Sequence, residues 1–278
     1  MTSLRGLTIG VIGAGTMGQA LIKGLLDRGV SRSSLRAAEA SAAMRRRVRR
    51  RFRVEVSGDN RAVARWADVI ILAVKPQQLP GVAAQLAPHL AHRPLVISIA
   101  AGVRLRWLER RLAGVPLARV MPNLPATVGC AFSAVVFSRR AAPRHRAVTK
   151  LLFNSIGCAV ELPERHLDAV TAVSGSGPAY VFFLVQAWEA AARSLGLPPG
   201  VVSQAVRQTL AGSVRLLEES GEAAAALIGQ VASKGGTTEA ALRLLARRRV
   251  HAHVVEAVRA AARRSKQLTV SDPSLKTA

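Results

Sequence analysis

The sequence predicts an α/β domain followed by an all-helical domain, and two observations carry this prediction. Up to residue 162, short apolar runs alternate with amphipathic ones, which is typical of parallel strands joined by crossover helices. After Leu162 the pattern changes to helical periodicity, which continues to about Leu268. We therefore place the domain boundary between residues 162 and 163, where Pro163 marks the change.

The first domain alternates predicted strands with predicted helices. Short length and β-branched content favour strands over buried helices. The predicted strands are Leu7–Ile12, Leu35–Ala38, Val69–Val74, Leu95–Ile99, Leu117–Met121, Ala131–Phe137 and Cys158–Leu162. The predicted helices are Met17–Arg28, Ala42–Arg51, Asn60–Trp66, Gln77–Leu90, Leu105–Leu112 and Pro143–Ser155.

The second domain is predicted to contain helices and no strand. Its helical pattern is interrupted at residues 196–200, 220–221 and 235–236, where glycines occur. The last ten residues are predicted to form a loose tail.

A glycine fingerprint follows the first predicted strand and directly precedes the first predicted helix. This position is the one that a dinucleotide-binding GxGxxG motif requires, so we predict a Rossmann domain. The first glycine permits a tight turn, the second lets a pyrophosphate approach the backbone, and the third lets helix and strand pack closely. The predicted cofactor-binding residues are Gly13, Ala14, Gly15, Thr16, Met17 and Gly18.

Glu39 lies about 20 residues after the fingerprint, where a Rossmann domain contacts the adenosine ribose. A carboxylate there accepts hydrogen bonds from a free 2′-hydroxyl and repels a 2′-phosphate. Arg45 and Arg46 follow closely and can neutralise such a phosphate. The residues thus leave the choice between NADPH and NADH open, and Glu39 can also be a solvated acid at a helix start.

Two glycine- and hydroxyl-rich runs lie in the second half of the chain. The first is Ser174-Gly175-Ser176-Gly177-Pro178, in which Ser176 is a predicted N-cap and Pro178 suits the first turn of a helix. Free backbone N–H groups at such a helix start bind a small carboxylate. The second run contains Gly235, Gly236, Thr237 and Thr238, whose glycines allow close backbone approach and whose hydroxyls offer donors.

These three motifs, in this order, resemble the Δ1-pyrroline-5-carboxylate reductase family over nearly the whole chain. The resemblance implies reduction of the C=N bond of 1-pyrroline-5-carboxylate to L-proline by hydride from NADPH, with NADH also possible. It implies that Thr238 is the catalytic residue, bonding the ring nitrogen. The implied substrate-binding residues are Ser174, Gly175, Ser176, Gly177, Gly235, Gly236, Thr237 and Thr238.

The resemblance also implies further cofactor contacts at later strand ends. These are Asn60, Ala73, Val74, Lys75, Pro76, Ala100, Ala101, Gly102 and Asn123. Two positions depart from the family pattern. Leu124 replaces a threonine after Asn123, and Ala223-Ala224 replace a His-Pro pair after Glu222.

The net charge of +24 and the predominance of arginine among 40 basic residues raise the question of nucleic acid. The arginine runs are dispersed, aromatic residues make up 4% of the chain, and no nucleic-acid-binding signature is present. We therefore expect no specific nucleic-acid partner. Cys130 and Cys158 belong to no ligand cluster, so we expect no metal site and a reducing cytoplasm.

The stretch after Pro178 is very apolar but carries Gln186, Glu189 and Arg193, which favours a buried helix over a membrane span. Residues 181–185 are apolar all round, so we expect this domain to form a homodimer that can assemble further. Two alternatives remain. One is an oxidoreductase related to β-hydroxyacid dehydrogenases, although the only helical-domain lysine before Lys266 is Lys234, in a glycine turn. The other is a basic Rossmann protein associated with nucleic acid.

Overall fold

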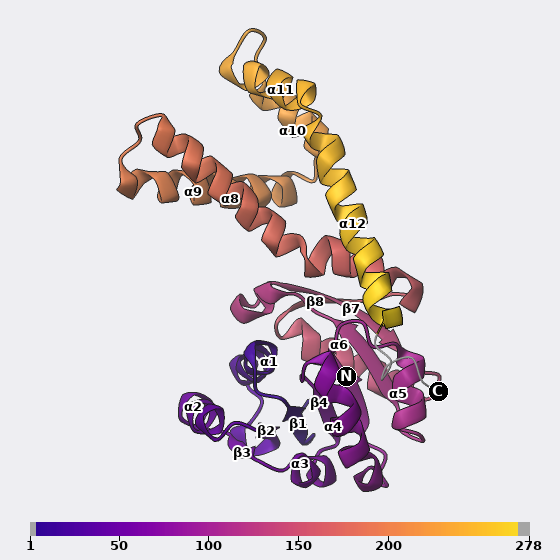
Figure 1. Ribbon diagram of the computed structural model, residues 1–278. Coiled ribbons are helices and arrows are strands. Elements are labelled where there is room, and N and C mark those ends of the chain that lie inside the picture. The colour runs from indigo at the N-terminus through magenta and orange to yellow at the C-terminus, as the bar shows by residue number, and fades with distance from the viewer. Residues whose placement is uncertain (1–3, 272–278) are drawn as a thin grey trace. The chain divides into compact units, whose positions relative to one another are not determined.

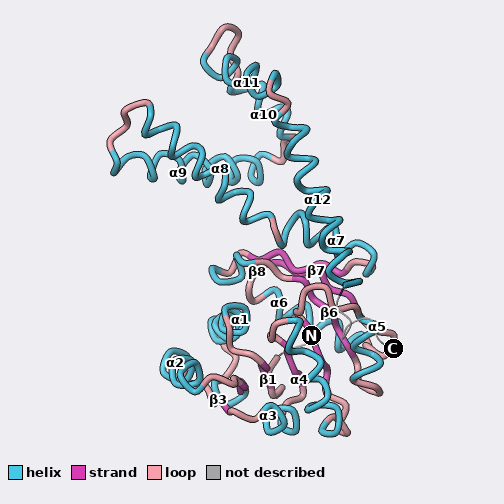
Figure 2. Tube along the Cα trace, viewed as in Figure 1, coloured by secondary structure: helices cyan, strands magenta, loops and turns pink. Residues whose placement is uncertain are grey.

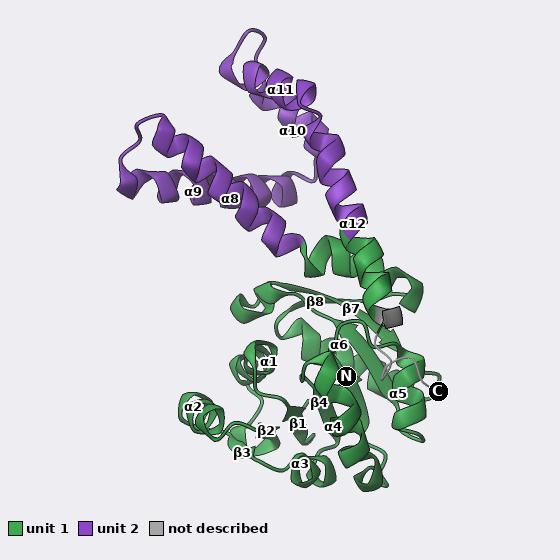
Figure 3. Cartoon of the chain, viewed as in Figure 1, with its two compact units in different colours: residues 1–176, 261–278 green, residues 177–260 purple. Residues whose placement is uncertain are grey.

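The computed structural model describes residues 4–271, and the chain divides into two compact units (Figure 3). Unit 1 comprises Met1–Ser176 and Ala261–Ala278, and unit 2 comprises Gly177–Ala260. The last helix thus begins in unit 2 and ends in unit 1. The functional domain boundary at residue 163 stays a prediction.

Unit 1 contains an eight-stranded sheet in the order β3-β2-β1-β4-β5-β6-β7-β8 (Figure 1). Neighbouring strands are parallel except β6 and β7, which are antiparallel. The strands are β1 (Ile9–Ile12), β2 (Leu35–Ala38), β3 (Glu55–Ser57), β4 (Val69–Leu72), β5 (Leu95–Ser98), β6 (Leu117–Met121), β7 (Ala131–Phe137) and β8 (Gly157–Glu161).

The predicted strands are confirmed within a few residues, with two differences. β3 was not predicted, because only Val56 of its three residues is buried and no apolar run marks it. β7 runs against the predicted parallel direction. A 3₁₀ turn, Leu124–Val128, connects it to β6, and this connection is too short for the crossover that parallel strands need.

Helices cover both faces of the sheet (Figure 2). One face packs against the first, second and sixth helices, through residues such as Leu21, Val48 and Phe153. The other packs against the third, fourth and fifth, through residues such as Val63 and Leu86. The six helices are α1 (Thr16–Asp27), α2 (Ala42–Phe52), α3 (Asn60–Trp66), α4 (Leu79–Leu86), α5 (Leu105–Arg111) and α6 (Pro143–Asn154). The long helix predicted over 77–90 is instead α4 flanked by two short 3₁₀ turns.

A π-helical turn, Thr171–Gly175, joins α7 (Leu167–Val170) to the helix that follows. Ser176 has helical backbone angles, φ −86° and ψ −20°, and its N–H donates to the carbonyl of Thr171 at 2.8 Å. The prediction that a helix begins at Ser176, with free N–H groups, is therefore wrong. Small residues of this kind typically start a helix. Here they lie within a continuing helix, which has a wider π-helical turn at this point.

Unit 2 is helical throughout, and the described residues after Glu161 contain no strand, as predicted. The helices are α8 (Gly177–Ser194), α9 (Pro199–Ser220), α10 (Ala224–Val231), α11 (Thr237–Arg247) and α12 (Val250–Ser271). The helix α12 includes the first residues of the predicted tail. The rest of that tail lies outside the described residues.

Unit 2 has almost no interior of its own. Val202 and Val206 are its only buried residues, whereas Phe182, Phe183 and Leu195 are 60%, 68% and 79% exposed. By length and composition alone, the continuous helix Glu164–Ser194 is apolar enough to cross a membrane, and 6% of its most apolar window is buried. Apolar surface on this scale marks an interaction site.

A partly buried ion pair fixes the start of this long helix within unit 1. The Glu164 carboxylate accepts from Arg119 Nη1 at 2.6 Å and from the Leu105 N–H at 2.8 Å. The Arg119 side chain is 7% exposed and comes from β6. One carboxylate therefore holds together a strand, the start of α5 and the chain before α7.

We expect Glu164→Ala to lower the free energy of unfolding by about 3 kcal/mol, because it leaves the buried Arg119 charge unpaired. Urea denaturation measures this change. The control is Glu55→Ala, which removes the exposed partner of Arg36 in a 2.8 Å ion pair and should cost less than about 1 kcal/mol. Equal effects of the two substitutions would contradict the role of the buried pair.

Candidate active site

The carboxyl ends of β1 and β4 form the point where the chain reverses its direction across the sheet. β1 pairs with β2 on one side and β4 on the other, with Ile12 opposite both Ala38 and Leu72. The residues that follow these three strands therefore emerge together at one edge. In open α/β sheets, this switch point is where ligands bind.

The glycine turn after β1 is shaped by close backbone approach. Gly13 has a φ of +95°, and a Cβ there would lie 2.8 Å from the carbonyl oxygen of Ala73. A Cβ on Gly18 would collide with the carbonyl of Gly13, whereas one on Gly15 would meet nothing within 4 Å. The first and third glycines of the motif are thus required by packing, and the second leaves the backbone open to a ligand.

The start of α1 fits a dinucleotide pyrophosphate. Gly15 is the N-cap and supplies no side-chain cap, and the first turn contains no acidic residue. The first N–H groups of α1 are therefore not taken by a carboxylate of the helix itself. These residues fit a dinucleotide pyrophosphate, and their assignment to the cofactor stays a prediction.

The Glu39 carboxylate is held beside this turn. It accepts from the N–H of Ala14 at 3.0 Å and from the N–H of Ser41 at 3.0 Å. Arg45 points at the same strand end, but its Nη1 donates to the carbonyls of Glu39 and Ala40, at 2.9 and 2.6 Å. Two arginines were predicted to neutralise a 2′-phosphate. Arg45 already donates hydrogen bonds to backbone carbonyls, whereas Arg46 is exposed to solvent.

The later strand ends add the remaining predicted cofactor residues. Ala73–Pro76 follows β4, and Val74 packs where a Cβ on Gly13 would fall. Residues 100–102 follow β5, with Ala100 buried and Gly102 at a φ of +76°. Asn60 instead donates from Nδ2 to Gln85 Oε1 at 2.9 Å, so in this structure it links α3 to α4.

Asn123 joins two segments that the sequence assigned to different ligands. Its Oδ1 accepts from the Phe132 N–H at 3.1 Å, and its Nδ2 donates to the carbonyl and hydroxyl oxygens of Ser174, at 3.2 and 3.0 Å. Gly175 also lies close to β6, because a Cβ there would be 2.9 Å from Met121 Cε. The π-helical turn is therefore fastened to the end of β6 within unit 1.

The Gly-Gly-Thr-Thr run lies in unit 2, at the start of α11. Gly235 has a φ of +75°, and Gly236 is the N-cap without a side-chain cap. The Gly235 N–H donates to the carboxylate of Glu239, so this donor is already used. Within the described residues, the hydroxyls of Thr237 and Thr238 make no hydrogen bond, so they remain available to a ligand.

The glycine turn at the switch point of unit 1 defines a dinucleotide-dependent oxidoreductase. Residues 164–268 match the family model for pyrroline-5-carboxylate reductase dimerisation, and residues 8–102 match that for NADP oxidoreductase, coenzyme F420-dependent. A pyrroline-5-carboxylate reductase from Synechocystis is 38% identical over 94% of this chain and 98% of the relative. The chain therefore belongs to the pyrroline-5-carboxylate reductase family.

Solved structures of pyrroline-5-carboxylate reductases are similar to this chain over both units. The enzyme from Coxiella burnetii has a TM-score of 0.88 and 30% identity, over 95% of this chain and 99% of that chain. Pyrroline carboxylate reductase from Plasmodium falciparum, solved with NADP bound, also has a TM-score of 0.88, with 28% identity over 96% of this chain and 100% of that chain.

We expect Glu39→Ser to raise the ratio of kcat/KM for NADPH over NADH by about tenfold, because a carboxylate at this strand end repels a 2′-phosphate. Steady-state kinetics with both cofactors measures the ratio. Glu39→Gln keeps the size of the side chain and removes its charge, so it should shift the ratio in the same direction. If neither substitution moves the ratio, the carboxylate does not face the ribose.

Proposed function

We propose that this chain reduces the C=N bond of 1-pyrroline-5-carboxylate to L-proline with NAD(P)H. The observation that carries the proposal is the match to pyrroline-5-carboxylate reductases over both units. A hydride adds to the imine carbon, and a proton remains on the ring nitrogen, which becomes a secondary amine. The cofactor is oxidised by the same two electrons.

The cofactor end of the proposal uses the strand ends of unit 1. When bound, the reduced nicotinamide supplies the hydride. The open backbone at Gly15 and the start of α1 hold the pyrophosphate, and Glu39 faces the ribose. The small residues Ala100–Gly102 leave room beside the strand ends for a flat ring. The protein therefore orients the donor.

The substrate end of the proposal uses the two glycine- and hydroxyl-rich runs. The backbone around Gly236 and Thr237 holds the substrate carboxylate at the start of α11, where Gly236 is the N-cap and supplies no side-chain cap. The resemblance also assigns Ser174–Gly177 to the substrate, and within unit 1 Asn123 holds Ser174 in place. The Thr238 hydroxyl hydrogen-bonds the ring nitrogen. A protonated imine is already electrophilic, so this scheme needs no strong general base.

The proposal places the enzyme in the cytoplasm as a homodimer that can assemble further, with no specific nucleic acid and no membrane. Its family has a dimerisation domain, which supports self-association. A second copy is the better cover for α8 than lipid, because that helix carries Glu189, whose carboxylate accepts from the Ser203 hydroxyl at 3.0 Å.

We expect Thr238→Ala to lower kcat/KM for the imine by about tenfold or more, because a hydrogen bond to the reacting nitrogen is lost in a closed site. NAD(P)H affinity and melting temperature should hardly change, since Gly236 is the helix cap and Thr238 is not. Thr238→Ser keeps the hydroxyl and should retain most activity. A Thr238→Ala enzyme with normal turnover and a lowered melting temperature would make Thr238 a structural residue.

We expect Phe183→Glu to produce monomers of lower melting temperature, because it puts a charge on the 68%-exposed ring of α8 that the second copy covers. Light scattering gives the mass, and calorimetry over a range of protein concentrations gives the melting temperature. The control is Val128→Glu, at a 73%-exposed apolar side chain of unit 1. A monomeric wild-type chain at micromolar concentration would contradict the proposal.

A further inference from the structure

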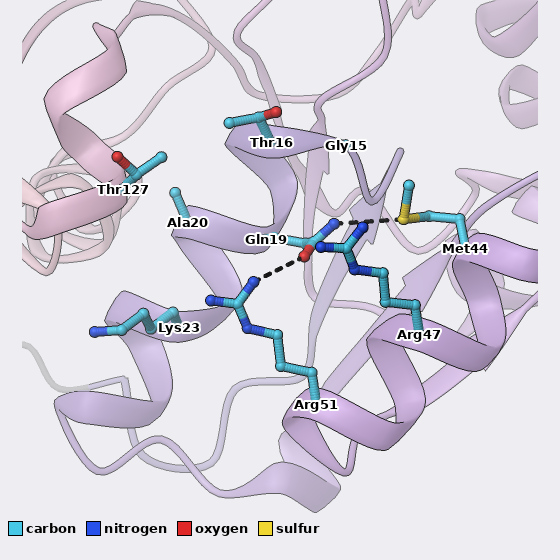
Figure 4. Close-up of a pocket in the computed structure, with 9 residues that line it drawn as sticks. All are labelled: Gly15, Thr16, Gln19, Ala20, Lys23, Met44, Arg47, Arg51 and Thr127. Carbon is cyan, nitrogen blue, oxygen red and sulfur yellow. Dashed lines mark hydrogen bonds between the residues drawn. The ribbon is translucent and has the colours of Figure 1, made fainter.

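A basic cavity lies between α1 and α2, beside the glycine turn (Figure 4). Its volume is about 350 Å³, at the small end of small-molecule sites. Its lining residues are Gly15, Thr16, Gln19, Ala20, Lys23, Met44, Arg47, Arg51 and Thr127.

The charge of this lining is of one sign. Lys23, Arg47 and Arg51 contribute cations, and none of the lining residues is acidic. Lys23 pairs with Asp27 at 2.6 Å, and Asp27 lies outside the cavity lining. A cavity lined in this way attracts a ligand with several negative charges more strongly than a single anion.

Arginines four residues apart on α2 lie on the same face of the helix, and different faces have different neighbours. Arg45 and Arg49 donate to backbone carbonyls, with Arg49 Nη2 at 2.8 Å from the carbonyl of Val56. Arg47 and Arg51, also four residues apart, face the cavity (Figure 4). The remaining exposed arginines of the helix lie outside the cavity lining, so the lining is a specific subset of a long basic run.

Gln19 connects the cavity to the dinucleotide turn. Its Nε2 donates to the carbonyl of Ala14 at 2.9 Å, and its Oε1 accepts from Arg51 Nη1 at 3.4 Å. Gly15 and Thr16 belong to both the turn and the cavity lining. A ligand in the cavity would therefore contact residues that are also predicted to bind the cofactor pyrophosphate. Its negative charge would repel the negatively charged pyrophosphate.

We propose that this cavity is a second anion site, which binds the polyphosphate group of a free nucleotide or of inorganic polyphosphate and competes with the dinucleotide. The occupant is a compact polyanion because Lys23, Arg47 and Arg51 line one small, solvent-open cavity, where a single polyphosphate can contact all three. An extended nucleic acid would instead engage arginines of several dispersed runs, most of which lie outside the cavity lining. The proposal depends on dinucleotide binding at the glycine turn and not on the identity of the imine.

The test measures tripolyphosphate binding by calorimetry and NADPH binding by fluorescence, without any substrate. Tripolyphosphate should bind the wild-type chain and raise the apparent Kd for NADPH in a competitive manner. Arg47→Ala/Arg51→Ala should weaken tripolyphosphate binding at least tenfold and relieve the competition. The control, Arg139→Ala/Arg140→Ala, removes the same charge from two exposed arginines of unit 1 that lie outside the cavity lining and should keep tripolyphosphate affinity. ATP, tested beside tripolyphosphate, distinguishes a nucleotide from the inorganic ligand.

Three results would overturn the proposal. The first is no competition in the wild-type chain. The second is an equal loss of tripolyphosphate affinity in both double variants, which makes the effect one of general charge. The third is a loss of NADPH affinity in Arg47→Ala/Arg51→Ala with unchanged NADH affinity, because the cavity then holds the cofactor's own 2′-phosphate. Since no turnover is measured, these outcomes are independent of whether the chain reduces the imine.

Discussion

The close approach of α1 to the turn after β1 determines where the functional groups of unit 1 meet. Gly18 has no space for a Cβ against the carbonyl of Gly13, and Gly13 itself lies against the backbone of Ala73. Because β1 is flanked by β2 and β4, these two contacts position the start of α1 between the strand ends on both sides. Side chains at Gly13 or Gly18 would separate the helix from the sheet at the point where the phosphate donors are needed.

The sequence predicted most of the fold because its signals extend over many residues. Buried strands such as β4 are uninterrupted apolar runs, and α2 begins at the predicted residue, with Ser41 as a side-chain cap. Local composition predicted the wrong secondary structure where the conformation depends on contacts with residues far along the chain. Ser176 lies in a run that favours a helix start, yet the segment before it winds into a π-helical turn fastened by Asn123. No periodicity encodes that bond.

The candidate site was predicted motif by motif, and the motifs were accurate about which segments lie at strand ends. What the sequence could not give is which predicted residues touch. Asn123 was assigned to the cofactor and Ser174 to the substrate, and only the fold brings their side chains to 3.0 Å. The arginine runs were likewise described from the sequence only as dispersed, without distinguishing the members of one run. Helical spacing places Arg45 and Arg47 on different faces of α2, but the packing of α2 beside α1 decides which of them faces a cavity.

The scarcity of buried residues in unit 2 also has a consequence during synthesis of the chain. In the proposed homodimer, a newly made copy leaves the ribosome with α8 uncovered, and exposed rings such as Phe182 and Phe183 stay in water until it meets a second copy. The sheet of unit 1 has its own core and can fold in that interval. The time before assembly is therefore when the chain is most prone to aggregate, and it shortens as the local concentration of copies rises. Translation of several chains from one messenger would favour correct assembly for this reason.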